Sequence, residues 1–300
     1  MKVEEIITNK IIEQLQKGVV PWCKPWRETK GMVPKNLITK KEYHGVNRLL
    51  LGMHGYSFPF WITFNQVKAI NASVKKGEKA TPVIYWNVSE HEKIEADGST
   101  KKHKTMILRY YNVFNVEQCE GIKPEKIPLL PVIGELTEPE TIDQCEGIVS
   151  NMPEKPPVIY GGNEAYYQPS LDTVNIPDRS TFRSKELFYS TLFHELVHAT
   201  GHQKRCNRKG VTGSEGNYTV FGSPAYAKEE LTAEIGATFL CHHSQIDNEK
   251  TFDNSVAYCQ SWLKRLQDDS KLIIYASANA EKAVNYILCK EDGNNDHESH

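Results

Sequence analysis

The feature that most constrains this chain is a His-Glu-x-x-His motif formed by His194, Glu195 and His198. Residues four apart share one face of a helix, so the two imidazoles can reach one metal ion while Glu195 faces an adjacent water. In such sites the zinc ion lowers the pKa of its bound water to roughly 7, and the carboxylate accepts the proton during attack on a carbonyl. Apolar residues fill the remaining positions of a buried helix: Leu192, Phe193, Leu196 and Val197. The motif predicts one zinc ion in a hydrolase site of the peptidase type; two ordinary structural histidines are the alternative.

A catalytic zinc site needs a third protein ligand, with the fourth position left for water. Metzincins place a histidine six residues after the second motif histidine, where this chain has Lys204, so that class is excluded. A carboxylate from a following helix remains. Glu230 and Glu234 share one helical face, whereas Glu229 is turned away by about 100°. We predict Glu230 as the ligand, with Glu234 as the alternate ligand or as the residue that orients a ligating histidine.

Two further segments flank the motif. His202 lies one turn beyond His198, but Gly201 is expected to end the helix, so we expect His202 to support the site without binding the metal. Upstream, residues 166–177 read as the strand region that would border a peptidase cleft. Such an edge could bind an extended substrate by strand addition, or it could be a purely structural strand.

Charge is distributed unevenly along the chain. Residues 1–128 carry a net charge of +8 and the remainder carries −10, which together give the net charge of −2. A basic half joined to an acidic half suggests two modules with different partners, and the basic one is a candidate for binding a polyanion. The alternative is that both halves simply have solvated surfaces.

The cysteine pattern and the lack of long apolar runs indicate in which cellular compartment the protein is expected. The seven cysteines include no Cys-x-x-Cys pair, so neither a disulfide framework nor a cysteine zinc site is indicated. No basic flank followed by an apolar run opens the chain, and no stretch approaches the roughly 18 apolar residues of a membrane span. We therefore expect a cytoplasmic protein with no membrane partner.

The basic half places aromatic residues among its cations. Lysines and arginines that follow phosphates, combined with aromatic faces that stack on bases, are typical of single-stranded nucleic-acid binding. The candidates are Trp22, Lys24, Trp26, Arg27, Lys40, Lys41, Tyr43, Lys75, Lys76 and Lys79. The alternative is that the tryptophans belong to the core, which the apolar surroundings of Trp61 and Trp86 favour.

The expected elements give an α+β protein with two domains. An amphipathic helix over residues 3–17 precedes short strands at 81–86 and 105–116, with a polar hairpin loop between them. Later, strands are expected at 158–160 and 173–176, and helices at 185–200, 226–243, 254–266 and 272–289. A proline-rich stretch puts the boundary near 124–132, which gives domains 1–128 and 129–290 and a disordered tail at 291–300.

Longer motifs in both halves carry a family resemblance. The first half contains Val20-Pro21-Trp22-x-Lys24-Pro25-Trp26, Tyr43-x-Gly45-Val46-Asn47, Val74-Lys75-Lys76-Gly77-Glu78-Lys79 and Val113-Phe114-Asn115-Val116. The second contains the run from Thr191 to His202 and Glu229-Glu230-Leu231-x-Ala233-Glu234. With these motifs the whole chain resembles the ArdC-type antirestriction proteins of mobile elements. The resemblance implies a mixed α/β N-terminal domain that binds single-stranded DNA, with Asn47 among its DNA-binding positions. It also implies a zincin-like metallopeptidase C-terminal domain and a role in protecting incoming DNA from restriction.

Two hypotheses follow from these observations. In the first, the N-terminal half holds single-stranded DNA while the C-terminal half, with Zn²⁺, cleaves an unidentified protein. In the second, the protein only coats the single strand and the metal is structural. A nuclease is disfavoured, because two histidines and one carboxylate fit amide hydrolysis better than a two-metal phosphodiester site.

Overall fold

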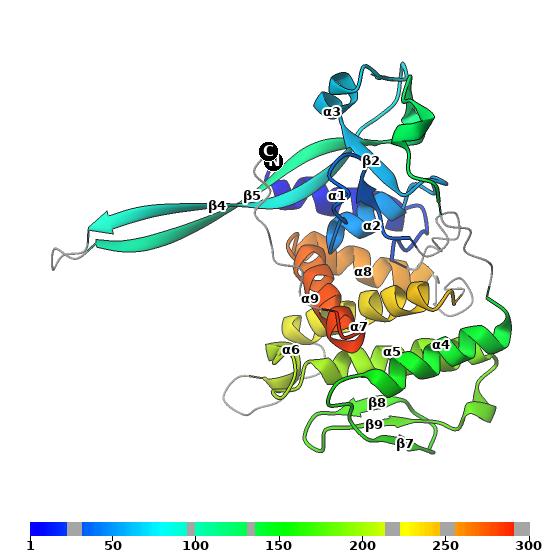
Figure 1. Cartoon of the computed structure of the whole chain (residues 1–300). Helices are drawn as coiled ribbons and strands as arrows, with labels where there is room; N and C mark the ends of the chain where they lie inside the picture. The colour runs from blue at the N-terminus through cyan, green and yellow to red at the C-terminus, as the bar shows by residue number, and fades with distance from the viewer. Residues whose placement is uncertain (23–31, 95–99, 131–135, 214–222, 247–255, 291–300) are drawn as a thin grey trace.

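The computed structural model describes residues 1–22, 32–94, 100–130, 136–213, 223–246 and 256–290. Its helices are α1 Val3–Leu15, α2 Val46–Gly52, α3 Phe64–Ala69, α4 Glu138–Asn151, α5 Lys185–Thr200, α6 Lys209–Thr212, α7 Pro224–His243, α8 Val256–Asp268 and α9 Leu272–Ile287. Its strands are β1 Lys35–Asn36, β2 Phe60–Thr63, β3 Ser73–Val74, β4 Thr81–Ile94, β5 Thr100–Asn115, β6 Cys119–Glu120, β7 Val158–Tyr160, β8 Tyr166–Gln168 and β9 Thr173–Ile176. Short 3₁₀ helices occupy Val116–Gln118, Pro124–Lys126 and Arg179–Thr181. Figure 1 shows the N-terminal sheets above a set of helices, with the β7–β9 sheet below them. The fold is α+β, as predicted.

The N-terminal half is built on a four-stranded sheet with the order β1-β2-β5-β4, beside the two-stranded sheet β3-β6. β1 and β2 are parallel, and the other neighbours in the larger sheet are antiparallel. Two small apolar clusters pack around this sheet, one centred on Phe60 and Ile62 and the other on Trp61 and Val83. The tail predicted at 291–300 lies outside the described residues.

The polar segment between the two predicted N-terminal strands is mostly strand and not loop. β4 and β5 pair antiparallel from Thr81 opposite Val113 to Ile94 opposite Thr100. Because main-chain hydrogen bonds hold an antiparallel ladder, polar side chains do not end it, and the prediction of a long loop here was wrong. β2 covers only the last residues of β5, from Val113 to Asn115, so the rest of β4 and β5 extends from the body as a two-stranded ribbon (Figure 1).

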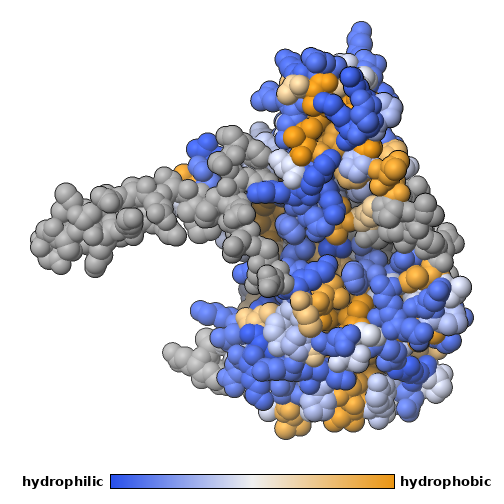
Figure 2. Space-filling model, in the orientation of Figure 1, coloured by the Kyte–Doolittle hydropathy of each residue, from blue (hydrophilic) through white to orange (hydrophobic). Residues whose placement is uncertain are grey.

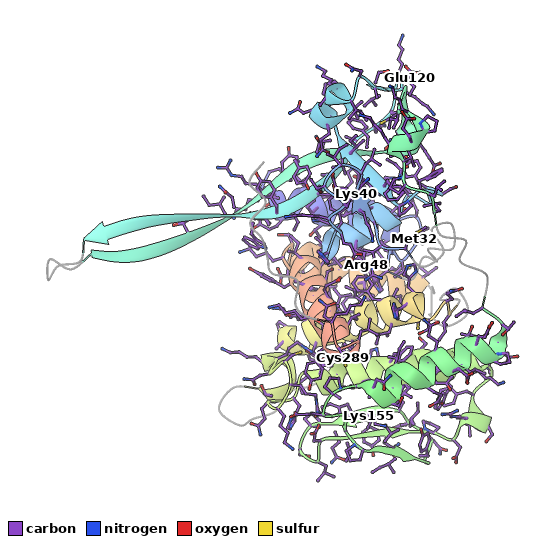
Figure 3. The ribbon with its side chains drawn as sticks, viewed as in Figure 1. Met32, Lys40, Arg48, Glu120, Lys155 and Cys289 are labelled. Atoms are coloured by element: carbon purple, nitrogen blue, oxygen red, sulfur yellow. The ribbon has the colours of Figure 1, made fainter. Side chains whose placement is uncertain are left out.

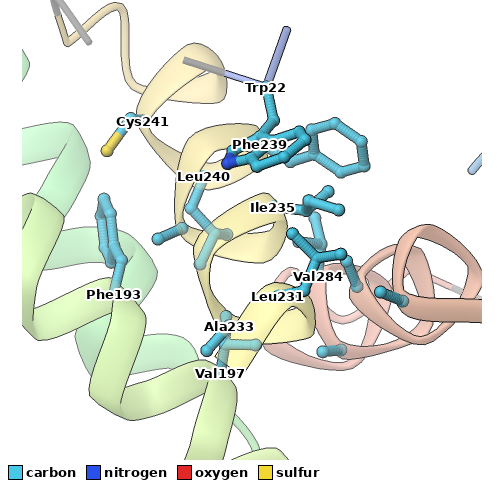
Figure 4. Close-up of a cluster of buried hydrophobic side chains, with 14 of the residues drawn as sticks. Trp22, Phe193, Val197, Leu231, Ala233, Ile235, Phe239, Leu240, Cys241 and Val284 are labelled. Carbon is cyan, nitrogen blue, oxygen red and sulfur yellow. The ribbon is translucent and has the colours of Figure 1, made fainter. Parts of the chain in front are cut away.

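The largest hydrophobic core lies on both sides of the predicted boundary. Ile7, Ile11 and Leu15 of α1 belong to the same buried cluster as residues of α5, α7, α8 and α9. Figure 4 shows the indole of Trp22 packed against α7 beside Ile235 and Phe239. The two halves of the chain are therefore joined by apolar packing as well as by the connecting segment.

A polar contact strengthens the same junction. The guanidinium carbon of Arg48, on α2, lies 4.1 Å from the centroid of the Phe239 ring on α7. Its Nη1 atom lies 4.0 Å from a carboxylate oxygen of Glu281 on α9. Figure 3 shows Arg48 where the upper part of the molecule meets α9, well below Lys40. A buried cation thus has an aromatic face and a carboxylate from the opposite half as partners.

The C-terminal half packs α5 between α7 and the sheet β7-β9-β8. Gly236 permits close approach of the two helices, because a Cβ atom there would lie 2.8 Å from a methyl group of Val197. This contact brings the motif helix and the glutamates of α7 together. On the small sheet, Ile159 is 52% and Tyr160 is 49% exposed. Hydrophobic residues also reach the surface in the lower part of the molecule (Figure 2). Within the described residues, no helix is long and apolar enough to cross a membrane.

Candidate metal centre

Helix α5 presents both motif histidines on one side. The hydroxyl of Ser184 accepts a hydrogen bond from the Leu187 N–H and fixes the start of the helix. The helix then runs without interruption from Lys185 to Thr200, as the sequence predicts. One turn separates His194 from His198, and their Nε2 atoms are 3.0 Å apart.

Helix α7 supplies a carboxylate to the same point. The Glu230 oxygens lie 3.7 Å from His194 Nε2 and 3.4 Å from His198 Nε2. One ligand atom from each of these three residues lies within 4.8 Å of the others. Two imidazoles and a carboxylate at this spacing fit a divalent metal with bonds of about 2.0–2.2 Å. The two histidines hold the pKa of Glu230 below its ordinary value against the opposing effect of burial, so the carboxylate is ionised and able to ligate.

Glu229 supports this cluster from the other side of His198. Its Oε1 is 3.2 Å from His198 Nδ1, and Arg208 donates to the same carboxylate over 3.0 and 2.5 Å. Burial alone would raise the Glu229 pKa, but Arg208 and His198 lower it to about 2. Burial lowers the pKa of His198, but the hydrogen bonds to Glu229 and Glu230 have the larger effect and raise this pKa to about 10. Glu229 was not among the predicted site residues, because its side chain lies about 100° away from the helical face of Glu230 and Glu234.

We expect Glu229→Gln to weaken metal binding by about 10- to 100-fold, since a carboxylate that accepts from a ligating imidazole fixes its orientation and basicity. Metal affinity would be measured by competition with a chromogenic chelator. The exposed Glu164→Gln is the matched control and should leave the affinity unchanged. An unaltered affinity in Glu229→Gln would mean that this hydrogen bond does not tune His198.

Glu234 has partners other than the histidines. Its Oε2 accepts a hydrogen bond from Trp22 Nε1 at 3.1 Å and a second one from the Tyr258 hydroxyl. Burial raises the pKa of Glu234 above its ordinary value, whereas the histidines bring that of Glu230 below it. Glu234 lies outside the cluster of ligand atoms, and the carboxylate within hydrogen-bonding distance of His198 Nδ1 is that of Glu229. Glu234 instead ties the N-terminal segment to α7.

His202 also lies apart from the cluster. Its Nδ1 accepts from the Lys204 N–H at 3.3 Å and lies 3.8 Å from an Asp172 carboxylate oxygen. Asp172 in turn accepts from the Tyr167 hydroxyl at 2.8 Å. His202 therefore links the segment after α5 to the turn between β8 and β9, and its support for the metal cluster is at most indirect.

Glu195 and Tyr226 complete the surroundings of the cluster. Glu195 is 7% exposed, and its charge acts on both His198 and Tyr226. The Tyr226 hydroxyl is hydrogen-bonded to Glu230, and burial with that carboxylate raises its pKa to about 12. Tyr226 was not predicted, although its position one helical turn before Glu230 was a usable signal.

Three of the predicted DNA-binding residues are structural. Trp22 is fully buried and Tyr43 is 5% exposed, so neither ring can stack on a base. The amide of Asn47 exchanges two hydrogen bonds of 2.8 Å with the main chain of Ile84. The prediction that the Trp22 and Tyr43 rings stack on DNA was wrong, because proximity to cations along the chain does not reveal which aromatic rings fold into the core.

The other predicted DNA-binding residues fall into two groups, those that are exposed and those outside the described residues. Lys40, Lys41, Lys75, Lys76 and Lys79 are exposed. The Lys40 ammonium donates to the Leu37 carbonyl, and that of Lys75 donates to the Glu117 carbonyl at 2.7 Å. Lys24, Trp26 and Arg27 lie outside the described residues.

Trp61 and Trp86, the two tryptophans with apolar surroundings in the sequence, differ in their exposure. Trp61 is buried, as its apolar surroundings suggest, whereas Trp86 on β4 is 40% exposed. The alternative interpretation, a core position, therefore does not hold for Trp86. It becomes a candidate for an exposed stacking surface.

Two histidines four apart on one helix and a glutamate from the next helix define a zincin-type metal centre. In agreement, residues 145–279 match the family described as zincin-like metallopeptidase. Residues 1–114 match the N-terminal domain of the anti-restriction factor ArdC. The chain belongs to the ArdC family of antirestriction proteins.

Solved structures support the same assignment along the whole chain. The metal-free crystal structure of the antirestriction ArdC protein from the R388 plasmid is 30% identical, with a TM-score of 0.72, and the match covers 96% of this chain and 97% of that one. The Mn(II)-bound structure of the same protein has a TM-score of 0.71 at the same identity and coverage.

Curated relatives include proteins of quite different length. A DNA primase TraC of Escherichia coli is 35% identical over 96% of this chain, and a second is 34% identical over 96%. The chain spans only 20% and 27% of the length of these primases. The uncharacterised protein y4eC of Sinorhizobium fredii is 30% identical, and the match covers 96% of this chain and 92% of y4eC.

Proposed function

We propose that this chain is a cytoplasmic antirestriction protein that binds single-stranded DNA and cleaves a protein partner with a zinc-dependent peptidase site. The observation that carries the proposal is the convergence of His194, His198 and Glu230, with Glu195 beside them. Zinc is the metal that two imidazoles and a carboxylate hold in most hydrolytic sites of this geometry. The Mn(II)-bound relative indicates that a related site accepts a divalent ion.

The side chains would divide the chemistry between them. When bound, zinc would supply Lewis-acid activation of water and of the scissile carbonyl. His194, His198 and Glu230 would hold it, and the Glu229–Arg208 pair would fix His198 through its Nδ1 atom. The Glu195 carboxylate would accept the proton of the attacking water and later deliver it to the leaving amine nitrogen.

The small sheet offers a place for an extended peptide. Among the described strands, β8 is an edge strand that pairs only with β9, and both contact α5. The segment over 166–177 predicted to border a cleft thus contains the edge strand β8 and the central strand β9. We propose that a substrate adds alongside β8, whose free main-chain groups can pair with an incoming strand.

Glu195→Gln should lower the rate of cleavage of an unfolded protein such as casein by roughly 100-fold or more, because a general base typically contributes 10²–10⁴. Metal content should not change, since Glu195 is not among the ligand atoms. The same variant would be compared with wild type for protection of incoming DNA in restricting cells. Full protection by Glu195→Gln would support the non-enzymatic coating protein instead.

We propose that single-stranded DNA binds to a surface that begins at the loop before β4 and continues along the β4–β5 ribbon. Lys75, Lys76 and Lys79 are exposed just before β4 begins at Thr81. Further along, Trp86 is 40% and Tyr110 is 44% exposed. The strand register pairs Trp86 with Leu108 and Ile84 with Tyr110, so the two aromatic residues are diagonal neighbours on one face. Diagonal residues lie about 7–8 Å apart, close enough for neighbouring bases to stack on both rings.

Charge reversal of Lys75, Lys76 and Lys79 should weaken binding of a fluorescent oligothymidine more than tenfold and reduce the salt slope by about 2, as three lost phosphate contacts predict. Reversal of Lys185, Lys204 and Lys264 is the control. Trp86→Ala with Tyr110→Ala should weaken binding with little change in slope, because stacking is not electrostatic. Equal binding of duplex and single strand by the full chain would contradict the proposed surface.

A further inference from the structure

A cavity with many polar and charged residues in its lining lies behind the metal cluster. It encloses about 380 Å³ and is formed where α6 and α9 pack against α7. Its wall includes the carboxylate of Glu229, whose Oε1 lies 3.2 Å from His198 Nδ1. The cavity is thus separated from a predicted metal ligand by a single side chain.

The lining of the cavity is strongly positive. Each of the three helices contributes one lysine, namely Lys209, Lys228 and Lys282. Asn207 and Asn279 add amide groups. Among the described residues of the lining, the one carboxylate is Glu229, and its charge is already balanced by Arg208. With Glu229 and Arg208 balancing each other, the three lysines give the lining a net positive charge.

The types of cation present favour one kind of anion. The fork of a free arginine would suit a carboxylate, but here the Arg208 guanidinium is committed to Glu229, the Thr200 hydroxyl and the Val197 carbonyl. The other cations of the lining are lysines, which bind phosphate as point charges; the Lys228 ammonium lies 4.6 Å from the centroid of the Tyr275 ring. The asparagine amides can donate further hydrogen bonds to the phosphate oxygens. A volume of about 380 Å³ exceeds that of a phosphate group and leaves room for the group that carries it.

We propose that this cavity is a phosphate-binding site. The phosphoryl oxygens would be held by Lys228 and Lys282 from opposite helices, with Asn279 beside them. The site does not depend on the peptidase proposal, because none of these three residues belongs to the metal cluster.

The test measures binding of inorganic phosphate to the full-length protein by calorimetry, at constant ionic strength set with chloride. The variant Lys228→Gln with Lys282→Gln should bind phosphate at least about tenfold more weakly than wild type, since two charges close to the ligand are lost. The control is Lys264→Gln with Lys290→Gln, which removes the same charge from exposed positions outside the cavity. Thermal unfolding of both variants would establish that the fold is retained.

A second arm identifies the source of the phosphate. If the cavity variant also weakens binding of an oligothymidine relative to the control variant, the site takes phosphodiester groups of DNA. If oligothymidine binding is equal in both variants while phosphate binding is lost, the site takes a small phosphorylated molecule. Either result supports the site. No saturable binding of inorganic phosphate by wild type, or equal weakening in the two variants, overturns it.

Discussion

Replacement of either His194 or His198 by alanine should reduce the metal content of the purified protein from about one ion per chain to almost none. Each imidazole is one of the three donors whose ligand atoms meet within 4.8 Å, and two donors cannot hold the ion against dialysis. Metal content would be measured by plasma emission spectrometry after dialysis against a weak chelator. Glu230→Ala should have a similar effect and Glu234→Ala a much smaller one.

His202→Ala is the matched control for this experiment, because it removes a histidine from the same segment without touching the cluster. It should retain the metal of the wild-type protein. Metal retained by His194→Ala and His198→Ala, or lost equally from the control, would show that the ion binds elsewhere. A larger loss in Glu234→Ala than in Glu230→Ala would transfer the ligand role to Glu234.

Trp22→Ala should lower the free energy of unfolding of the full chain by about 3–5 kcal/mol, the usual range for truncating a buried aromatic residue. The indole is fully buried and meets the Trp262 ring edge to face at 5.9 Å. Within the described part of the chain, it also supplies one of the two hydrogen bonds that Glu234 accepts. Urea unfolding followed by circular dichroism would measure the change.

Trp22→Phe separates packing from hydrogen bonding. It keeps most of the apolar contact but leaves Glu234 with the Tyr258 hydroxyl alone, so we expect a smaller loss, of about 1–3 kcal/mol. A loss below about 1 kcal/mol in Trp22→Ala would instead mean that the first half of the chain contributes little to the shared core. In that case Trp22 could again be considered for binding DNA.

The metal cluster was largely predictable because its geometry is local. A spacing of four residues on a helix fixes the relation of His194 to His198, and helical phase alone favoured Glu230 over Glu229 as ligand. The role of Glu229 could not be read in the same way. Its partners His198 and Arg208 lie 31 and 21 residues away, and they meet it only because α5 and α7 pack closely at Gly236.

The N-terminal half was less predictable because the sequence does not show which of its aromatic residues are buried in the core and which lie on the surface. Trp22 and Trp86 are both tryptophans of a basic half of the chain, yet one is fully buried and the other is 40% exposed. The difference depends on contacts across more than two hundred residues, such as that of Trp22 with Glu234. Periodicity also missed the length of β4 and β5, whose ladder is held by the main chain rather than by an apolar face.

The core shared by the two halves has a consequence for how such proteins diversify. Side chains of α1 and Trp22 fill space between helices of the second half, so neither family region keeps its packing when the other is replaced. Recombination should therefore transmit both regions as one inherited block. The two Escherichia coli primases agree with this, since each matches 96% of the chain within a much longer protein. Chimaeras of two family members should fold only when the residues of α1 and α8 that face each other come from the same parent.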